Sequence, residues 1–163
     1  MTETVVRLAV PEDAERIVAL CEMLHEENGL FPLSLAKVHA LLDRAFLKQG
    51  GIIGVIGEVG EPVAAIYLAL DQMYYSETWF LNEAFNFVSP DHRKSDYARK
   101  LIAYAKACSD AMQMPLLMGI LSNQRTEVKA RLYERQLEKA GAYFVYNRKL
   151  SGVTAWDAGD TRP

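Results

Sequence analysis

Residues 87–102 of this 163-residue sequence read Phe87-Val88-Ser89-Pro90-Asp91-His92-Arg93-Lys94-Ser95-Asp96-Tyr97-Ala98-Arg99-Lys100-Leu101-Ile102. The apolar residues before Ser89 are typical of the end of a strand, and Tyr97 and Leu101 have the spacing of one helix face. A short basic loop with Arg93 and Lys94 joins them. Backbone N–H groups at a helix start lie at the positive end of the helix dipole, so a diphosphate would fit here. An ordinary helix start with solvated charges is the alternative interpretation.

Upstream of this loop, three segments predict an antiparallel meander. Residues 52–58, 62–70 and 79–88 are rich in β-branched and aromatic residues, which are typical of strands. Turn residues separate them at Gly60-Glu61-Pro62 and over residues 71–77.

The N-terminal part predicts one strand and two helices. Residues 5–9 have the pattern of a strand, and Pro11 begins a helix that ends near Asn28-Gly29. Ser34 is the predicted N-cap of a second helix, which Gln49-Gly50-Gly51 ends.

After the helix that begins near Tyr97, residues 116–121 predict a short buried strand. Residues 126–140 predict a further helix, which Gly141 would cap, with Val128, Leu132 and Leu137 facing inward. Residues 143–146 begin another strand, and residues 149–156 predict a last one.

The resulting order is β-α-α-β-β-β-α-β-α-β-β. It predicts an α/β (α+β) fold with a mixed, mostly antiparallel sheet flanked by helices, because the strand–helix–strand unit after the meander needs a crossover. We expect one domain over residues 1–156 and a polar C-terminal tail over residues 157–163.

Composition excludes several classes of function. The chain has 18 basic and 21 acidic residues and a formal net charge of −3, which argues against a nucleic-acid binder, because such proteins normally have a strongly basic face. No apolar run reaches the roughly 18 residues of a membrane helix, and no signal-peptide pattern is present, so we expect a cytoplasmic protein without membrane association. The three histidines lack metal-ligand spacing, and we expect no metal. Cys21 and Cys108 are expected to be buried free thiols.

Two ordered motifs resemble the signatures of the GNAT N-acetyltransferase superfamily. Residues 88–98 resemble its coenzyme A motif, Arg/Gln-x-x-Gly-x-Gly/Ala after a strand that ends in Val-x-Pro. Asn123, Arg131-Leu132-Tyr133-Glu134 and Lys139-Ala140-Gly141-Ala142 resemble its second motif. The resemblance covers about residues 5–146. It implies a GNAT-like fold, acetyl-CoA as co-substrate and transfer of the acetyl group to an amine acceptor by direct attack.

The resemblance also implies a set of cofactor-binding residues, namely Phe87, Val88, Arg93, Lys94, Ser95, Asp96, Tyr97, Ala98 and Asn123. Asp96 departs from the motif, which has Gly at this position. A carboxylate facing the diphosphate would weaken binding by up to about two powers of ten. We expect Asp96 to point outward in the first helical turn, where Lys94 and Lys100 can neutralise it.

Two residues are implied in catalysis. Tyr133 matches the family tyrosine that protonates the departing thiolate; a core aromatic is the alternative interpretation. Glu83 is the best candidate for the base that deprotonates the amine. Strand alternation places it on the face of Leu81, Phe85 and Phe87, where a carboxylate is costly unless it lines a cleft. A partnered or exposed carboxylate is the alternative. The Val88 N–H is implied to polarise the thioester carbonyl.

The acceptor is expected to be a small-molecule amine or a protein amino group. Residues 26–32 and the turn Met73-Tyr74-Tyr75 are the candidate walls of its site, and the turn is alternatively a contact of a homodimer. Three functions remain open: an active N-acetyltransferase, a coenzyme A-binding GNAT homologue without catalytic activity, and a nucleotide-binding module of another family. The sequence has no Gly-x-x-x-x-Gly-Lys-Ser/Thr loop, which weighs against the third.

Overall fold

The computed structural model of this chain describes residues 4–122 and 126–146. The chain divides into two compact units. The first comprises Met1–Leu24 and Ser34–Gly119, and the second comprises His25–Leu33 and Ile120–Pro163. The single domain expected over residues 1–156 stays a prediction.

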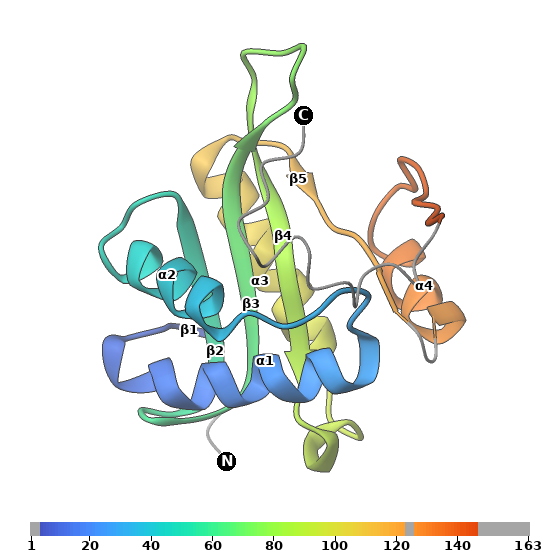
Figure 1. Ribbon diagram of the computed structural model, residues 1–163. Helices are drawn as coiled ribbons and strands as arrows, with labels where there is room; N and C mark the ends of the chain where they lie inside the picture. Colours follow the sequence, from blue (N-terminus) through green and yellow to red (C-terminus); the bar gives the residue numbers. More distant parts are fainter. Residues whose placement is uncertain (1–3, 123–125, 147–163) are drawn as a thin grey trace. The chain divides into compact units, whose positions relative to one another are not determined.

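The first unit is built on a five-stranded sheet in the order β1-β2-β3-β4-β5 (Figure 1). Its strands are β1 (Arg7–Leu8), β2 (Gly51–Glu58), β3 (Glu61–Gln72), β4 (Trp79–Val88) and β5 (Leu116–Leu117). Strands β1 to β4 pair antiparallel, and β5 pairs parallel with β4. The predicted meander is confirmed, and β4 has the predicted bounds. The strand predicted over residues 116–121 is shorter and ends at Leu117.

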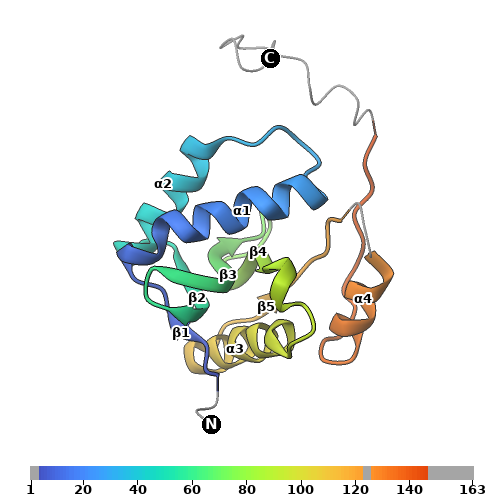
Figure 2. The ribbon, with the colours of Figure 1, turned by 90° about the horizontal axis from the view of Figure 1, so that it is seen from below.

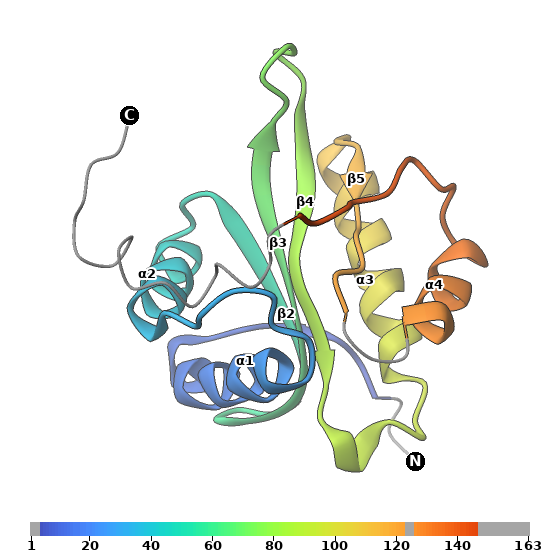
Figure 3. The same cartoon turned by 45° about the vertical axis from the view of Figure 1, so that its right-hand side comes forward.

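Helices cover both faces of this sheet. They are α1 (Ala14–Asn28), α2 (Leu35–Phe46) and α3 (Tyr97–Met112), with 3-10 turns η1 (Pro11–Asp13) and η2 (Pro90–His92) before α1 and α3. The part of α1 in this unit lies with α2 on one face, and α3 lies on the other (Figure 2 and Figure 3). Ser34 caps α2 as predicted, because its Oγ accepts a hydrogen bond from the Lys37 N–H at 3.4 Å. The predicted class, a mostly antiparallel mixed sheet flanked by helices, is confirmed.

Each face of the sheet has its own hydrophobic core. Ala65 and Tyr67 of β3 pack with buried residues of α1 and α2, whereas Ala64, Ile66 and Leu68 pack with buried residues of α3. Successive side chains of a strand point to opposite faces, so β3 is buried on both sides. This explains why β3 is a nearly continuous apolar run instead of an alternating one.

A buried carboxylate ties the start of the chain to the β2–β3 turn. Asp13 is completely buried, and its two oxygens accept hydrogen bonds from Arg7 Nη1 at 2.7 Å and Arg7 Nη2 at 2.9 Å. The same carboxylate accepts from the backbone N–H groups of Val10 at 2.9 Å and Gly60 at 2.8 Å. One side chain thereby joins β1, η1 and the β2–β3 turn.

The second unit contains α4 (Thr126–Glu134) and the end of α1. Ser122 links the two parts of this unit, because its Oγ donates to Asn28 Oδ1 at 2.7 Å and accepts from Lys129 Nζ at 3.2 Å. The predicted helix over residues 126–140 is too long: α4 ends at Glu134, and Gly141 does not cap it. Val128 is 54% exposed, and no residue of α4 is buried, so no packed face supports a longer helix.

Residues 143–146 do not form the predicted strand. Their side chains are 53–95% exposed, and the described part of this unit contains no strand with which they could pair. A lone strand leaves its backbone groups without ladder partners, which explains the difference. The strand predicted over residues 149–156 lies outside the described residues. In the described ranges, no helix has both the length and the apolar character needed to cross a bilayer.

Candidate functional site

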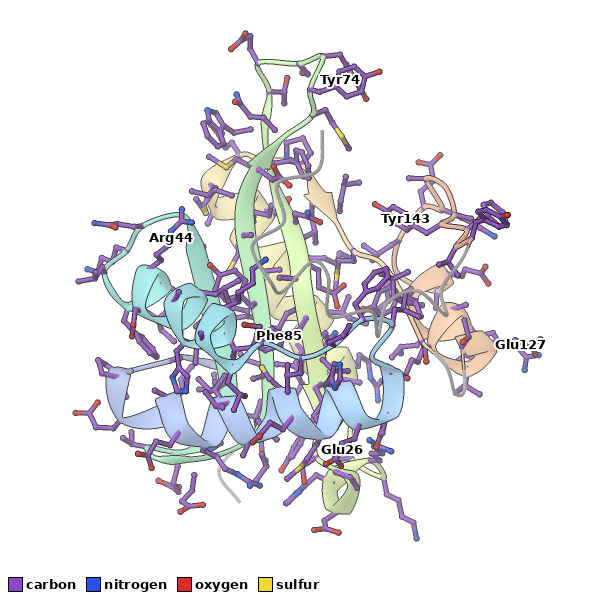
Figure 4. The ribbon with its side chains drawn as sticks, viewed as in Figure 1. Glu26, Arg44, Tyr74, Phe85, Glu127 and Tyr143 are labelled. Atoms are coloured by element: carbon purple, nitrogen blue, oxygen red, sulfur yellow. The ribbon has the colours of Figure 1, made fainter. Side chains whose placement is uncertain are left out.

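A β-bulge at Ala84 divides β4 into two parts. Leu68 of β3 pairs with Glu83, and Tyr67 pairs with Phe85, so Ala84 is one extra residue without a partner on β3. Because of this extra residue, the side chains that follow Ala84 point to the face opposite to the one that simple alternation predicts. Glu83 therefore shares the α3 face with Leu68 and Leu81, whereas Phe85 points to the face covered by α1 and α2 (Figure 4).

This bulge corrects one prediction. Simple alternation places Glu83 on one face with Leu81, Phe85 and Phe87. The structure keeps Leu81 with Glu83 but moves Phe85 and Phe87 to the opposite face. Glu83 is half-buried and has an interaction partner.

On both sides of the bulge, successive residues of β4 direct their backbone groups alternately to its two edges. The Leu81 N–H donates to the Pro115 carbonyl oxygen at 2.8 Å on the β5 side, and the parallel pairing with β5 ends at Asn82. The Ser89 N–H donates to the Val63 carbonyl oxygen at 2.9 Å on the β3 side. Because backbone groups alternate along an antiparallel pair, Val88 directs its N–H and carbonyl toward the β5 edge.

A small hollow lies where β4 ends and α3 begins. Its volume is about 70 Å³, and it is lined by Val88, His92, Arg93, Ser95 and Ala98. Ser95 holds the loop in shape, because its Oγ donates to the His92 carbonyl oxygen at 2.5 Å and accepts from the Tyr97 N–H at 3.3 Å. Four residues predicted from the loop motif, Val88, Arg93, Ser95 and Ala98, thus line one hollow within the first unit, whereas Phe87, Lys94, Asp96 and Tyr97 are not part of its lining.

Arg93 lines this hollow and contacts the end of β4. Its guanidinium carbon lies 5.4 Å from the centre of the Phe87 ring, a cation–π arrangement. Its Nε lies 3.5 Å from the Val88 carbonyl oxygen, at the outer limit of a hydrogen bond. Lys94 is exposed beside it. Arg93 therefore places a positive charge in the lining of the hollow, and Lys94 is the next residue in the chain.

Asp96 occupies the N-cap position of α3, and its carboxylate is directed along the helix. Its Oδ2 lies 3.3 Å from Lys100 Nζ, four residues further on. Its backbone φ is −90°, a conformation open to any residue, so this position does not require Gly for its backbone angle. The expected outward orientation is the one observed, with Lys100 as the partner. The side chain of Asp96 is accordingly not part of the lining of the hollow.

His92 lines the hollow, but the sequence did not predict it as a site residue. Its ring lies 6.0 Å from the Tyr97 ring with an interplanar angle of 17°. Its Nδ1 is buried and has no hydrogen-bond partner in the described part of the chain. No signal in the sequence indicates this, because a lone histidine in a basic loop has the pattern of a solvated side chain.

Three further site predictions concern Tyr133, Asn123 and the turn Met73-Tyr74-Tyr75. Tyr133 is half-buried on α4 in the second unit and has an interaction partner. Asn123 lies outside the described residues. The turn Met73-Tyr74-Tyr75 precedes β4, and Tyr74 is fully exposed at its tip (Figure 4). This turn lies at the opposite end of β4 from the hollow, and a strand of that length spans about 30 Å.

Neither cysteine has the character of a nucleophile. Both are free thiols, as predicted; Cys21 is buried and Cys108 is half-buried. Burial raises the pKa of Cys21 to about 12 and also raises the pKa of Cys108, so both are neutral near pH 7.

The chain has the fold of the GNAT acetyltransferases, as the sequence resemblance implied. One similar structure is a predicted acetyltransferase with acetyl-CoA from Clostridium acetobutylicum, at 10% identity and a TM-score of 0.70, covering 89% of this chain and 96% of that chain. Another is ribosomal-protein-alanine N-acetyltransferase from Brucella melitensis biovar Abortus 2308, at 16% identity and a TM-score of 0.68, covering 89% and 99%.

A third is AAC(6')-Iy in complex with the bisubstrate analog CoA-S-monomethyl-acetylneamine, at 13% identity and a TM-score of 0.68, covering 90% of this chain and 98% of that chain. No protein-family model matches the sequence, and no curated protein matches it. Likeness at these identities establishes the fold, and function has to be argued from the site.

Proposed function

We propose that this protein is an N-acetyltransferase that transfers the acetyl group of acetyl-CoA to an amine acceptor by direct attack. The observation that carries the proposal is the hollow between β4 and α3, which is lined by the cationic side chain of Arg93, with the exposed Lys94 next to it in the chain. In this GNAT fold, the hollow lies where the end of β4 meets the start of α3, and we take it as the candidate anion site. Two of the similar structures were solved with acetyl-CoA or a CoA-containing analog, which supports the same ligand here.

The loop would hold the diphosphate through charge and backbone donors. Arg93 and Lys94 supply positive charge, and the first turn of α3 supplies N–H groups at the positive end of the helix dipole. Residues 93–98 would surround the diphosphate, with Ala98 small enough at the wall of the hollow to allow close approach. Asn123 is carried over from the family as a further contact.

The edge of β4 would orient the rest of the cofactor. Phe87 and Val88 lie at the end of β4, and Val88 directs backbone groups toward the edge where pairing with β5 has already ended. An extended chain with amide groups can hydrogen-bond to such an edge as an additional strand does. The Val88 N–H would then donate to the acyl carbonyl oxygen and stabilise the charge that develops on it.

Acetyl-CoA would supply an acyl group already activated as a thioester. The chain itself would bring amine and acyl carbon together, which accounts for much of the acceleration in such reactions. We assign the proton steps to Glu83, which would accept a proton from the ammonium acceptor, and to Tyr133, which would donate one to the departing sulfur. Both assignments come from the family resemblance and the position of Glu83 on β4 beside the bulge.

The proposal is tested by calorimetric titration of the protein with acetyl-CoA and, in parallel, with ATP. We expect saturable 1:1 binding of acetyl-CoA and no comparable binding of ATP. Preferential binding of ATP would instead support a nucleotide-binding module of another family.

A second assay separates an enzyme from a binding protein. Release of free thiol from acetyl-CoA is followed over a panel of small amines and peptides with free amino groups. Acceptor-dependent release supports the transferase. Tight binding with no release over the whole panel would favour a coenzyme A-binding homologue without catalytic activity.

A further inference from the structure

Among the residues that line the hollow, His92 has a buried side-chain nitrogen without a hydrogen-bond partner in the described part of the chain. Its backbone is well held: the His92 N–H donates to the Ser89 carbonyl oxygen at 2.9 Å, and its own carbonyl accepts from the Ser95 N–H at 3.1 Å. The Ser95 hydroxyl also donates to that carbonyl. The ring, by contrast, has a buried Nδ1 without a hydrogen-bond partner among the residues that the structure describes.

A buried polar atom without a partner is unfavourable, and proteins retain few of them. Such an atom at the wall of a ligand hollow gains a partner when a ligand with complementary groups binds. A neutral imidazole carries one N–H, and the nitrogen that bears it is set by the partner available. An acceptor-only ligand at this position selects the tautomer with the proton on Nδ1.

The surroundings of the ring favour an anionic acceptor. Val88 and Ala98 contribute apolar wall, and Arg93 contributes a full positive charge at the same hollow. The carboxylate at the start of α3, that of Asp96, is paired with Lys100. The ring stacks on Tyr97. Because Nδ1 is buried, its contact with a ligand requires a turn of the ring about χ2, a torsion that is broad in histidine.

Building on the function proposed above, we propose that His92 is a further binding residue for the cofactor's diphosphate, with its Nδ1–H donating to a phosphate oxygen. This assigns to the residue before Arg93 a direct role that the coenzyme A motif itself does not include. A hydrogen bond to a charged acceptor is stronger than a neutral one, so loss of the donor should weaken binding by about tenfold.

The test compares two variants of the full chain by calorimetric titration with coenzyme A. His92→Leu removes the donor and keeps an apolar side chain against Tyr97, whereas His92→Asn keeps an amide nitrogen near the position of Nδ1. We expect coenzyme A affinity to fall about tenfold in His92→Leu and by less than about threefold in His92→Asn. His39→Leu, on the exposed surface of α2, is the matched control and should bind like the wild type.

A second readout uses the wild-type protein and does not depend on the variants folding. The ring nitrogens of His92 are observed by ¹⁵N NMR before and after addition of coenzyme A. We expect the Nδ1 resonance to move to the position of a protonated, hydrogen-bonded nitrogen. No change on saturation, or equal loss of affinity in His92→Leu and His92→Asn, would overturn the assignment. If wild-type protein binds no coenzyme A at all, the proposed function itself fails, and that result is distinct from either of these.

Discussion

Among single residues, Asp96 is where sequence and family motif disagree, and the ion pair with Lys100 explains how the chain accommodates it. The contact is a surface pair at 3.3 Å, which contributes at most about 0.5 kcal/mol. Asp96 makes no side-chain hydrogen bond as N-cap, so replacement by Gly loses little there as well.

We therefore predict that Asp96→Gly leaves acetyl-CoA affinity within about twofold of the wild type and lowers the free energy of unfolding by no more than about 1 kcal/mol. Titration calorimetry and urea unfolding measure the two quantities. Lys100→Gln removes the same ion pair without changing the backbone and is the matched control. Binding that becomes tenfold tighter in Asp96→Gly, with the gain lost at high salt, would show that the carboxylate faces the diphosphate.

Tyr133 is the second residue whose role can be isolated. If its hydroxyl donates a proton to the departing sulfur, Tyr133→Phe lowers kcat while the affinity for acetyl-CoA stays nearly unchanged. The thiol is a fair leaving group, so we expect a loss of about tenfold to a hundredfold. Steady-state thiol release and calorimetry provide the two numbers. Parallel loss of affinity and turnover would instead indicate that Tyr133 is a packing residue.

At the level of elements, the β2–β3 hairpin depends on Gly57. Its φ is +125°, and an added Cβ would lie 2.7 Å from the Glu61 carbonyl oxygen and 2.9 Å from the Pro62 Cα. Both neighbours are backbone atoms, which cannot move aside cheaply. We predict that Gly57→Ala lowers the free energy of unfolding by about 2–3 kcal/mol.

Gly119→Ala is the matched control for this prediction. Nothing lies within 4 Å of the position that a Cβ would take at Gly119, and its φ is not in the left-handed region. The stability of Gly119→Ala should stay within about 1 kcal/mol of the wild type. Equal effects of the two substitutions in urea unfolding would contradict the account of the hairpin.

Some features of the helices and strands can be predicted from the sequence, and others cannot. The bounds of β4 and the role of Ser34 as the cap of α2 are predictable, because both follow from local pattern and local chemistry. The bulge at Ala84 is not, because no Gly marks it and it arises only in the pairing of β4 with β3. The helix predicted over residues 126–140 is too long because residues 135–140 include good helix formers, whereas its length depends on a packed face that α4 lacks.

In the candidate site, too, some features are predictable from the sequence and others are not. The position of the loop between β4 and α3 is predictable from the order of residue types, whereas diphosphate binding by residues 93–98 stays a prediction. The role of His92 is not, because the burial of Nδ1 depends on the packing of the ring against Tyr97. The predicted face of Glu83 is wrong relative to Phe85 for the same reason as the bulge: a one-residue insertion in pairing is invisible to alternation counted along one strand.

For the molecule as a whole, Asp13 links the pH to the stability of the fold. Burial alone would raise the pKa of this carboxyl, but hydrogen bonds from Arg7, Val10 and Gly60 outweigh it and lower the pKa. A carboxyl with a lowered folded-state pKa contributes stability above its unfolded pKa, about 3.9, and this stability is lost as the pH falls through the folded-state value.

We predict that Asp13→Asn lowers the free energy of unfolding by about 2–4 kcal/mol at pH 7, because Arg7 loses its charged partner. The difference from the wild type should shrink as the pH falls below about 4. Urea unfolding between pH 7 and pH 3 measures both. Glu12→Gln, an exposed neighbour, should change stability by less than about 0.5 kcal/mol. A difference that stays constant down to pH 3 would mean that the charge of Asp13 is not what stabilises the fold.

The central claim is that the hollow between β4 and α3 binds the diphosphate of acetyl-CoA, and charge reversal at its rim tests it most directly. Acetyl-CoA affinity is measured by calorimetry for the wild type, Arg93→Glu and Arg44→Glu, which reverses an exposed arginine on α2 (Figure 4). We predict a loss of more than about tenfold for Arg93→Glu, reduced by added salt, and a change within about twofold for Arg44→Glu. Unchanged affinity in a folded Arg93→Glu protein would contradict the claim.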